Sequence, residues 1–292
     1  MEIRSGFVAI VGRPNVGKST LLNQIVGSKV AIVSSKPQTT RNQIQGVLTR
    51  PDAQVIFIDT PGLHKPLHKL GEYMVQQARS AILEVDVVVF LFDGAAGFTA
   101  ADERIHQELV DLAQGGPELL VVANKADLME KDQREELLTL FPTLLFVSAV
   151  TGEGVDAFVE HLVSKLPLGP QYYPSDWVSN HPEQFIVAEF IREKVLEYTE
   201  EEVPHAVAVM IDDFSQREDR DLIDIHATII VERDSQKGII IGKGGRMLKS
   251  IGQGARQEIE ALLGSQVNLQ LWVKVKKNWR KKEEELRRLG YE

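Results

Sequence analysis

Five short apolar runs, rich in β-branched and aromatic residues, recur in the first half of this 292-residue chain, and longer helical stretches separate them. The runs are FVAIVG, QVIFID, VVVFLFD, LLVVAN and TLLFVSA, starting at residues 7, 54, 87, 119 and 143. Continuous apolar strands that alternate with helices are typical of a mostly parallel sheet covered on both faces. The predicted fold class is therefore α/β with a doubly wound sheet. Ligands of such sheets bind at the carboxyl ends of the strands.

The composition limits the chemistry and the compartment of the protein. There is no cysteine, and the seven histidines form no cluster with metal-ligand spacing. Disulfides, thiolate nucleophiles and cysteine-zinc sites are thereby excluded, and a metal is expected to be a hard ion held by oxygen atoms. The chain has neither a signal-type amino terminus nor a run of eighteen apolar residues, so we expect a cytoplasmic protein.

The length and a proline-rich stretch predict two domains. Residues 166–185 contain four prolines and little periodicity, which indicates an extended linker. We predict a first domain at 1–166, a linker at 167–182 and a second domain at 183–292. The net charge of −9 is unevenly distributed, because residues 237–288 carry +8 and leave −17 for the rest. The basic end is a candidate binding surface for phosphates.

The loop after the first run, GRPNVGKS at 12–19, fits the pattern G-x-x-x-x-G-K-[ST] between a strand and a helix. Its glycines allow backbone N–H groups to turn around phosphate oxygens, and the helix adds its positive end. Lys18 is predicted to bridge the outer phosphates, and the Ser19 hydroxyl to ligate Mg²⁺. The alternative is an ordinary tight turn, but such a turn needs no Lys-Ser pair.

Polar residues after two other runs complete a nucleotide site. Asp59, in FIDTPG, is placed to hold Mg²⁺ through water, and the Gly62 N–H to reach the terminal phosphate. In NKAD at 124–127, the Asp127 carboxylate matches the N1–H and amine of guanine, which adenine lacks. The alternative for each is a plain turn or a charged surface loop.

The predicted cofactors are therefore GTP or GDP and Mg²⁺, and the site extends to SAVTGEG, which begins at Ser148. The predicted nucleotide-binding residues are Gly12, Arg13, Pro14, Asn15, Val16, Gly17, Lys18, Ser19, Thr20, Asp59, Thr60, Pro61, Gly62, Leu63, Asn124, Lys125, Ala126, Asp127, Ser148, Ala149 and Val150.

With these motifs, residues 7–165 resemble the TRAFAC-type translational GTPases. The resemblance implies that QTTRNQ at 38–43 is the first switch and that Thr40 ligates Mg²⁺ in the GTP state, with Thr39 as the alternative. The metal ligands are then Ser19, Thr40 and Asp59, and the catalytic residues are Lys18, Thr40 and Gly62.

Two positions bear on the rate of hydrolysis. Leu63 stands where Ras-like proteins have a glutamine that orients water, so turnover is expected to be slow unless stimulated. In related GTPases an asparagine at the place of Asn15 ligates K⁺, and we hypothesise the same here; the alternative is that Asn15 only tolerates a left-handed turn. His64 and His68 are interpreted as loop residues without a catalytic role.

The second half predicts a smaller α+β domain with a G-K-G-G loop at 242–245. A helix at 183–199, strands at 205–214 and 221–233, a helix near 246–262 and a strand at 266–277 surround the loop. KH domains clamp the nucleic-acid backbone with a G-x-x-G loop between two helices. The alternative is a solvated basic face with structural Trp272 and Trp279. The predicted RNA-binding residues are Gly242, Lys243, Gly244, Gly245, Arg246, Lys249, Lys274, Lys276 and Lys277.

A GTPase domain, a proline-rich linker and a KH domain together resemble the Era family of GTPases over nearly the whole chain. This resemblance implies binding to the tail of small-subunit ribosomal RNA, a role in assembly and maturation of the small ribosomal subunit, and peripheral association with the inner membrane. We expect a monomer. Two rival hypotheses are a second domain that docks to membranes or proteins, and a small-molecule kinase with the same phosphate loop.

Overall fold

The structure is a computed structural model that describes residues 3–36, 38–61 and 68–291. It divides into two compact units, and each is described by itself. The first unit consists of Met1–Ala31, Thr40–Pro66 and Met74–Asn180. The second consists of Ile32–Thr39, Leu67–Tyr73 and His181–Glu292. Two short segments from the first half of the chain therefore belong to the second unit.

The first unit is built on one mostly parallel sheet with the strand order β2-β3-β1-β4-β5-β6. The pairs β3-β1, β1-β4, β4-β5 and β5-β6 are parallel, whereas β2 runs antiparallel to β3. The strands are β1 (Ile3–Val11), β2 (Ile44–Thr49), β3 (Ala53–Asp59), β4 (Val87–Asp93), β5 (Glu118–Asn124) and β6 (Leu145–Phe146), and β7 (Leu168–Gly169) pairs antiparallel with β1.

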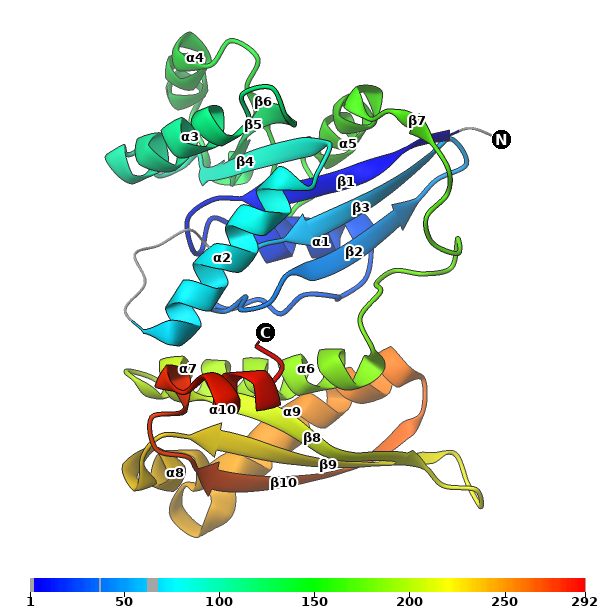
Figure 1. Cartoon of the computed structure of the whole chain (residues 1–292), viewed down its shortest axis with the longest axis vertical. Helices are drawn as coiled ribbons and strands as arrows, with labels where there is room; N and C mark the ends of the chain where they lie inside the picture. Colours follow the sequence, from blue (N-terminus) through cyan, green and yellow to red (C-terminus); the bar gives the residue numbers. More distant parts are fainter. Residues whose placement is uncertain (1–2, 37, 62–67, 292) are drawn as a thin grey trace. The chain divides into compact units, whose positions relative to one another are not determined.

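Helices cover both faces of this sheet, with α2 in front and α1 behind in Figure 1. The helices are α1 (Lys18–Val26), α2 (Lys69–Leu83), α3 (Ala100–Leu112), α4 (Lys131–Leu140) and α5 (Val155–Lys165), with a 3₁₀ turn η1 (Ala126–Leu128). Because the central strands are covered on both sides, six consecutive residues of β4, Val87 to Phe92, are fully buried. The predicted doubly wound α/β class is confirmed.

The proline-rich stretch after β7 runs along the edge of this sheet. The Gln54 side-chain oxygen accepts hydrogen bonds from the backbone N–H groups of Tyr172 and Tyr173, at 2.7 and 2.9 Å. Farther along, the Val47 N–H of β2 donates to the carbonyl of Val178 at 2.9 Å. Residues up to Asn180 thus belong to the first unit and cover part of an otherwise open strand edge.

The second unit contains a three-stranded sheet in the order β10-β9-β8, with β9 and β10 parallel and β8 and β9 antiparallel. One face packs against α6 and α9 around a core that includes Phe190, Ile225 and Ile251. This arrangement confirms the smaller α+β domain. Its elements are α6 (Glu183–Tyr198), α7 (Val203–Ala206), β8 (Ala208–Gln216), β9 (Leu222–Val231), α8 (Asp234–Ile241), η2 (Lys243–Gly245), α9 (Arg246–Leu263), β10 (Gln266–Val275), η3 (Trp279–Lys281) and α10 (Glu283–Arg288).

Candidate functional site

The loop between β1 and α1 closes around the side chain of Lys18. Lys18 is the first residue of α1 and is only 7% exposed. Its Nζ donates to the carbonyl oxygens of Gly12 and Arg13, at 3.1 and 3.0 Å. The loop carbonyls therefore hold the ammonium in place, while the first turn of α1 has no side-chain cap and leaves its N–H groups available to an anion.

Two loop residues adopt left-handed backbone conformations. Gly17 has φ of 100°, and a Cβ atom there would lie 2.2 Å from the Asn124 side-chain nitrogen, so only glycine fits. Asn15 has φ of 66°. This conformation agrees with the simpler interpretation of Asn15 as a residue that tolerates a left-handed turn, and it leaves the K⁺ hypothesis open.

Three oxygen-bearing side chains from different elements meet beside Lys18. The Ser19 hydroxyl donates to Asp59 Oδ2 at 2.5 Å, and Thr40 Oγ1 lies 3.1 Å from Ser19 Oγ and 3.2 Å from the same carboxylate oxygen. Asp59 ends β3 and is completely buried. Its second oxygen, Oδ1, has no hydrogen-bond partner among the described residues.

Burial opposes the charged forms of both ionisable groups here. It raises the pKa of Asp59, while Lys18, Ser19 and Thr40 act in the opposite direction. Burial also lowers the pKa of Lys18, and the Asp59 carboxylate partly offsets this effect. A buried carboxylate oxygen without a partner, next to two hydroxyls, fits a hard divalent cation. The residues predicted to ligate Mg²⁺ are thus brought together.

Asn124, at the end of β5, joins the phosphate loop to the loop after β6. Its side-chain nitrogen donates to the Val16 carbonyl at 2.8 Å, and its oxygen accepts from the Ala149 N–H at 3.0 Å. Asn124 is 2% exposed, so these bonds are shielded from water. Asn124 therefore braces the phosphate loop against the loop after β6.

The remaining predicted base-binding residues lie around Asn124. Lys125 has φ of 66°, and its Nζ lies 2.5 Å from the Asp93 carboxylate. Asp127 lies exposed in η1, where its carboxylate is accessible to a ligand. Ser148 is fully buried and Val150 is 77% exposed, so the loop after β6 passes from the core to the surface.

Sequence reasoning missed the partner of Arg13. Its Nε donates to the buried Asp102 carboxylate at 2.7 Å, which ties the phosphate loop to the start of α3. Asp102 also closes a capping box with Thr99, and the T-x-x-D spacing before the helix was the available signal. Because Asp102 holds Arg13, the phosphate loop has a second anchor besides Asn124.

Some predicted residues have other placements. Gly62, Leu63 and His64 lie outside the described residues. His68 precedes α2, whose residues up to Tyr73 belong to the second unit. Its Nδ1 accepts a hydrogen bond from the Gly71 N–H at 3.2 Å, which is the geometry of a helix cap. His68 thus has a structural function at the helix start, in line with the interpretation that it is not catalytic.

In the second unit, the G-K-G-G loop joins α8 to α9. Gly244 and Gly245 have φ of 63° and 76°, and a Cβ atom at either would meet open space. Helix α9 starts after Gly245 without a side-chain cap. Lys243 and Arg246 are exposed here, as is Lys249 one turn into α9. The loop therefore presents backbone N–H groups and cations to solvent, which suits a phosphate chain.

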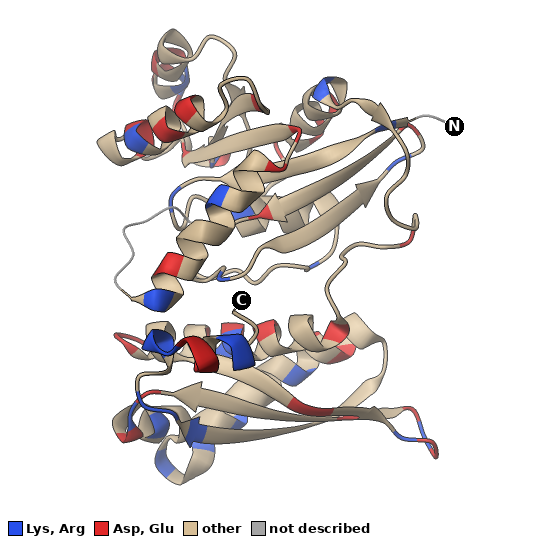
Figure 2. Ribbon diagram, in the orientation of Figure 1, with Lys and Arg blue, Asp and Glu red and all other residues tan. Residues whose placement is uncertain are grey.

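The predicted RNA-binding lysines at the end of β10 lie apart from the G-K-G-G loop in the sequence and have different surroundings. Lys276 Nζ lies 2.5 Å from the Glu285 carboxylate, so this cation already has a partner within the unit. Lys274 alternates on β10 with the core residue Val273 and so projects from the opposite face of the sheet. In Figure 2 several blue segments of the second unit lie around α8, the start of α9 and the end of β10, and others lie in α10 and in the loop between β8 and β9. The loop cations form the more compact group.

The two tryptophans have different environments. Trp279 is fully buried, donates from Nε1 to the Ala206 carbonyl at 2.9 Å and stacks on Tyr291. Trp272 is 44% exposed and contacts His226 edge to face. The structural alternative therefore describes Trp279, which cannot stack on a base.

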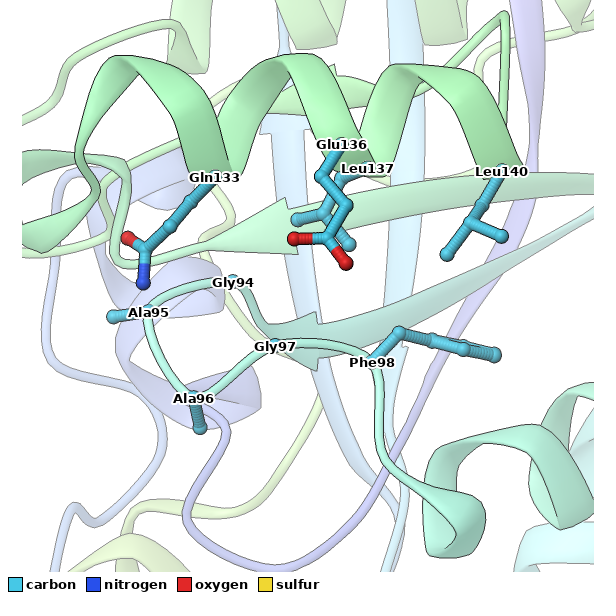
Figure 3. A pocket seen from close by; sticks show the side chains of 9 residues that line it. All are labelled: Gly94, Ala95, Ala96, Gly97, Phe98, Gln133, Glu136, Leu137 and Leu140. Carbon is cyan, nitrogen blue, oxygen red and sulfur yellow. The ribbon is translucent and has the colours of Figure 1, made fainter.

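A separate pocket in the first unit lies between α4 and the loop after β4 (Figure 3). Its lining residues come from Gly94–Phe98 and from the α4 side chains Gln133, Glu136, Leu137 and Leu140. None of these is a predicted nucleotide-binding residue. Among the described residues, no helix is long and apolar enough to cross a membrane.

Comparison with known proteins identifies the family. A curated relative, GTPase Era of Alkaliphilus metalliredigens, is 52% identical over 298 residues and covers the whole of both chains. The chain belongs to the Era family of GTPases. Residues 7–125 match the model described as 50S ribosome-binding GTPase, and residues 202–280 match the KH domain model.

Two solved Era structures match 99% of this chain and of their own chains, each with a TM-score of 0.93. One is a variant of Aquifex aeolicus Era bound to GDP and AlF₄⁻, 39% identical. The other is Era in complex with MgGDPNP and nucleotides 1506–1542 of 16S ribosomal RNA, 40% identical. The predicted Era resemblance is confirmed, and the protein is an enzyme that hydrolyses GTP.

Proposed function

We propose that this protein is a GTP-dependent switch that binds small-subunit ribosomal RNA near its tail and assists assembly and maturation of the small ribosomal subunit. The observation that carries the proposal is the Era structure, 40% identical along the whole chain, that holds both MgGDPNP and a 16S RNA segment. In this chain the phosphate loop and the G-K-G-G loop have geometries that suit these two ligands.

The nucleotide is proposed to lie with its phosphates on the loop at 12–17 and its base against Asp127. Two loop carbonyls already orient the Lys18 ammonium. Contact with the outer phosphates therefore costs little side-chain conformational entropy. Ser19, Thr40 and Asp59 would hold Mg²⁺, which neutralises phosphate charge when it is bound. The Thr40 hydroxyl already lies among these ligands.

Hydrolysis is proposed to be slow without a stimulus, because Leu63 cannot orient water by a hydrogen bond. Stimulation by K⁺ at Asn15 is the accompanying hypothesis. It is tested by GTP turnover in matched KCl and NaCl buffers, where a faster rate in KCl is expected. Equal rates in the two buffers would refute the K⁺ role and leave the GTPase assignment intact.

RNA binding is proposed to centre on the G-K-G-G loop, whose cations are exposed and whose Gly244 and Gly245 have open space beside them. The test is titration of a labelled RNA with the sequence of the small-subunit RNA tail into protein loaded with Mg·GDPNP or with GDP. A different affinity in the two loaded forms is expected. Identical affinities would end the switch proposal, and absence of binding in both would end the RNA proposal.

Peripheral membrane association and a monomeric state complete the proposal. The alternative hypothesis is that the basic domain docks to a lipid surface. Helix α10 gives it little support, because this helix spans six residues and starts with three glutamates. Flotation with vesicles of anionic lipid, run beside the RNA titration, separates the two partners. Sedimentation of the nucleotide-loaded protein tests the monomer.

A further inference from the structure

The segment Ile32–Thr39, which leads directly to Thr40, is part of the second unit. Ile32 is 3% exposed and belongs to the same apolar core as α6. The Val33 N–H donates to Glu193 Oε1 at 2.8 Å, and the Thr39 carbonyl accepts a hydrogen bond from Arg192 Nη2. Both ends of the segment are therefore held by consecutive residues of α6.

Local hydrogen bonds restrain the described residues of the segment between these two anchors. The Thr39 hydroxyl donates to the Lys36 carbonyl at 2.6 Å, and the Lys36 N–H donates to Ser34 Oγ at 3.1 Å. These two bonds reduce the conformational freedom of Ser34, Lys36 and Thr39. A movement of α6 should therefore also move Thr39, whose carbonyl is bonded to Arg192 of that helix.

Arg192 is costly to bury, which calls for a physical explanation. Its side chain is 1% exposed, and Glu189 accepts a 2.7 Å bond from Nε and a second bond from Nη2. Burial acts to lower the pKa of Arg192, but Glu189, together with Tyr291 and Glu193, acts in the opposite direction, so the pKa is raised and the cation persists. Nη1 has no hydrogen-bond partner within the described ranges. A buried ion pair of this kind stabilises a fold weakly compared with apolar residues of similar volume.

The position of the Arg192 bond explains what the ion pair accomplishes. The Thr39 carbonyl and the Thr40 N–H belong to one planar peptide group. A donor that fixes the direction of the Thr39 oxygen therefore also fixes the direction in which the chain enters Thr40. In this arrangement Thr40 Oγ1 lies 3.1 Å from Ser19 Oγ and 3.2 Å from Asp59 Oδ2.

We propose that Arg192 is a positioning residue for Thr40, and that Arg192 and Glu193 couple the nucleotide state to the KH domain through Ile32–Thr39. The proposal rests on the proposed function, in which Thr40 ligates Mg²⁺ only with the triphosphate. Loss of the anchor releases Thr40 from the ligand set. It therefore weakens the binding of Mg·GDPNP more than that of GDP, which does not use Thr40.

The first experiment uses the full chain and the variant Arg192→Gln, which keeps a polar side chain but loses the cation. Fluorescent Mg·GDPNP and GDP are titrated, and the ratio of the two affinities is compared with wild type. We expect the preference for Mg·GDPNP to fall by about 5- to 10-fold, within the usual range of coupling between sites. An unchanged ratio would overturn the proposal. Arg192→Lys, which restores a cation and a donor, should recover part of the preference.

Lys194→Gln is the matched control, because it removes one cation from the same helix. Lys194 pairs with Glu197 and Glu258, at 2.9 and 2.7 Å, and both partners lie in α6 and α9. Its loss should leave the affinity ratio at the wild-type value. An equal fall in Lys194→Gln and Arg192→Gln would show that the ratio reports general damage to α6, which would overturn the role of Arg192.

A double-mutant cycle with Thr40→Val separates positioning from a purely structural effect. If Arg192 acts through Thr40, Arg192→Gln should not change the affinity ratio further once the Thr40 hydroxyl is absent. A full, additive effect in that background would contradict the proposal. If Arg192→Gln does not fold, Glu193→Ala supplies the same test from the Val33 end, with Glu197→Ala as its control.

The RNA titration distinguishes failure of this inference from failure of the proposed function. The ratio of RNA affinities in the GDPNP and GDP forms is measured for wild type and Arg192→Gln, and we expect it to move towards one in the variant. A wild-type ratio of one would refute the switch itself. A wild-type ratio that differs from one and is retained in Arg192→Gln would refute only the route through α6.

Discussion

The two glycine loops of this protein have similar helix starts and opposite surroundings. Gly17 caps α1 and Gly245 caps α9, both in the left-handed conformation and both without a side-chain cap. The lysine of the first loop, Lys18, is 7% exposed, whereas Lys243 in the second is exposed to solvent. A Cβ atom at Gly17 would strike Asn124, while one at Gly244 would meet open space.

For the phosphate binding that we propose at both loops, this difference implies two modes. The first loop is preorganised by buried hydrogen bonds, so its groups are oriented before the ligand arrives and a small number of contacts can give high affinity. The second loop offers cations on flexible side chains, and binding there depends on many weak, salt-sensitive contacts. Single substitutions should therefore have large effects in the first loop and small, additive effects in the second.

The largest expected effect follows removal of the buried cation. Lys18→Ala deletes a charged donor to the phosphates and leaves Asp59 without its nearby counter-charge. We expect GTP affinity to fall by at least about 100-fold, or ~3 kcal/mol. Titration with fluorescent GTP measures this loss. RNA binding in the absence of nucleotide serves as the control and should be unchanged; a loss of less than tenfold in GTP affinity would contradict a preorganised loop.

A matched pair of glycine substitutions compares the loops directly. Gly17→Ala forces a left-handed alanine and displaces Asn124 from its bonds to Val16 and Ala149, at a cost of about 3 kcal/mol. Gly244→Ala has only the conformational cost of about 1 kcal/mol. Calorimetric unfolding of both nucleotide-free variants measures the difference. Equal destabilisation would show that the two loops are equally constrained.

Substitution of Asp127, which we propose to contact the base, should have an intermediate effect. Asp127→Asn replaces an acceptor pair by an amide that cannot accept from both guanine N–H groups. We expect roughly 30-fold weaker GTP binding, about 2 kcal/mol, with a shift towards xanthosine triphosphate. Competition between the two nucleotides measures the shift. Unchanged selectivity for guanine would exclude Asp127 from base recognition.

The sequence predicted those features that depend on local spacing. The strands at 54–59 and 87–93 were recognisable because they contain four and six consecutive apolar residues, a pattern typical of strands buried on both faces. Lys18, Ser19 and Asp59 were predicted as site residues because their motifs follow predicted strands, and the structure brings Ser19 and Asp59 together beside Lys18. The pairing of Arg13 with Asp102 was missed, since it joins residues 89 positions apart whose contact depends on the placement of α3.

The assignment of Ile32–Thr39 to the second unit lay beyond sequence reasoning for the same reason. The segment is polar and lies within the predicted GTPase domain, and no periodicity indicates that Ile32 enters the core around α6. Lys276 illustrates the opposite case, in which the sequence predicted a contact that the structure does not favour. Its place in a basic run predicted an RNA contact, whereas the structure gives it Glu285 as a partner, and charge counts contain no information on such pairing.

The smallest effects are expected among the cations of the second unit, where the exposed Lys243 of the loop and the paired Lys276 after β10 can be compared directly. Lys243→Gln should weaken RNA binding about threefold and reduce the slope of log affinity against log salt by about 0.7, the value for one phosphate contact on a single strand. Lys276→Gln should leave this slope unchanged, because its cation is held by Glu285 at 2.5 Å. Instead it should lower the unfolding free energy of the protein by about 0.5 kcal/mol.

The slopes are obtained from RNA titrations between low and moderate salt. If Lys276→Gln changed the slope as much as Lys243→Gln, RNA would have to displace Glu285, and the contrast between paired and available cations in this unit would be wrong.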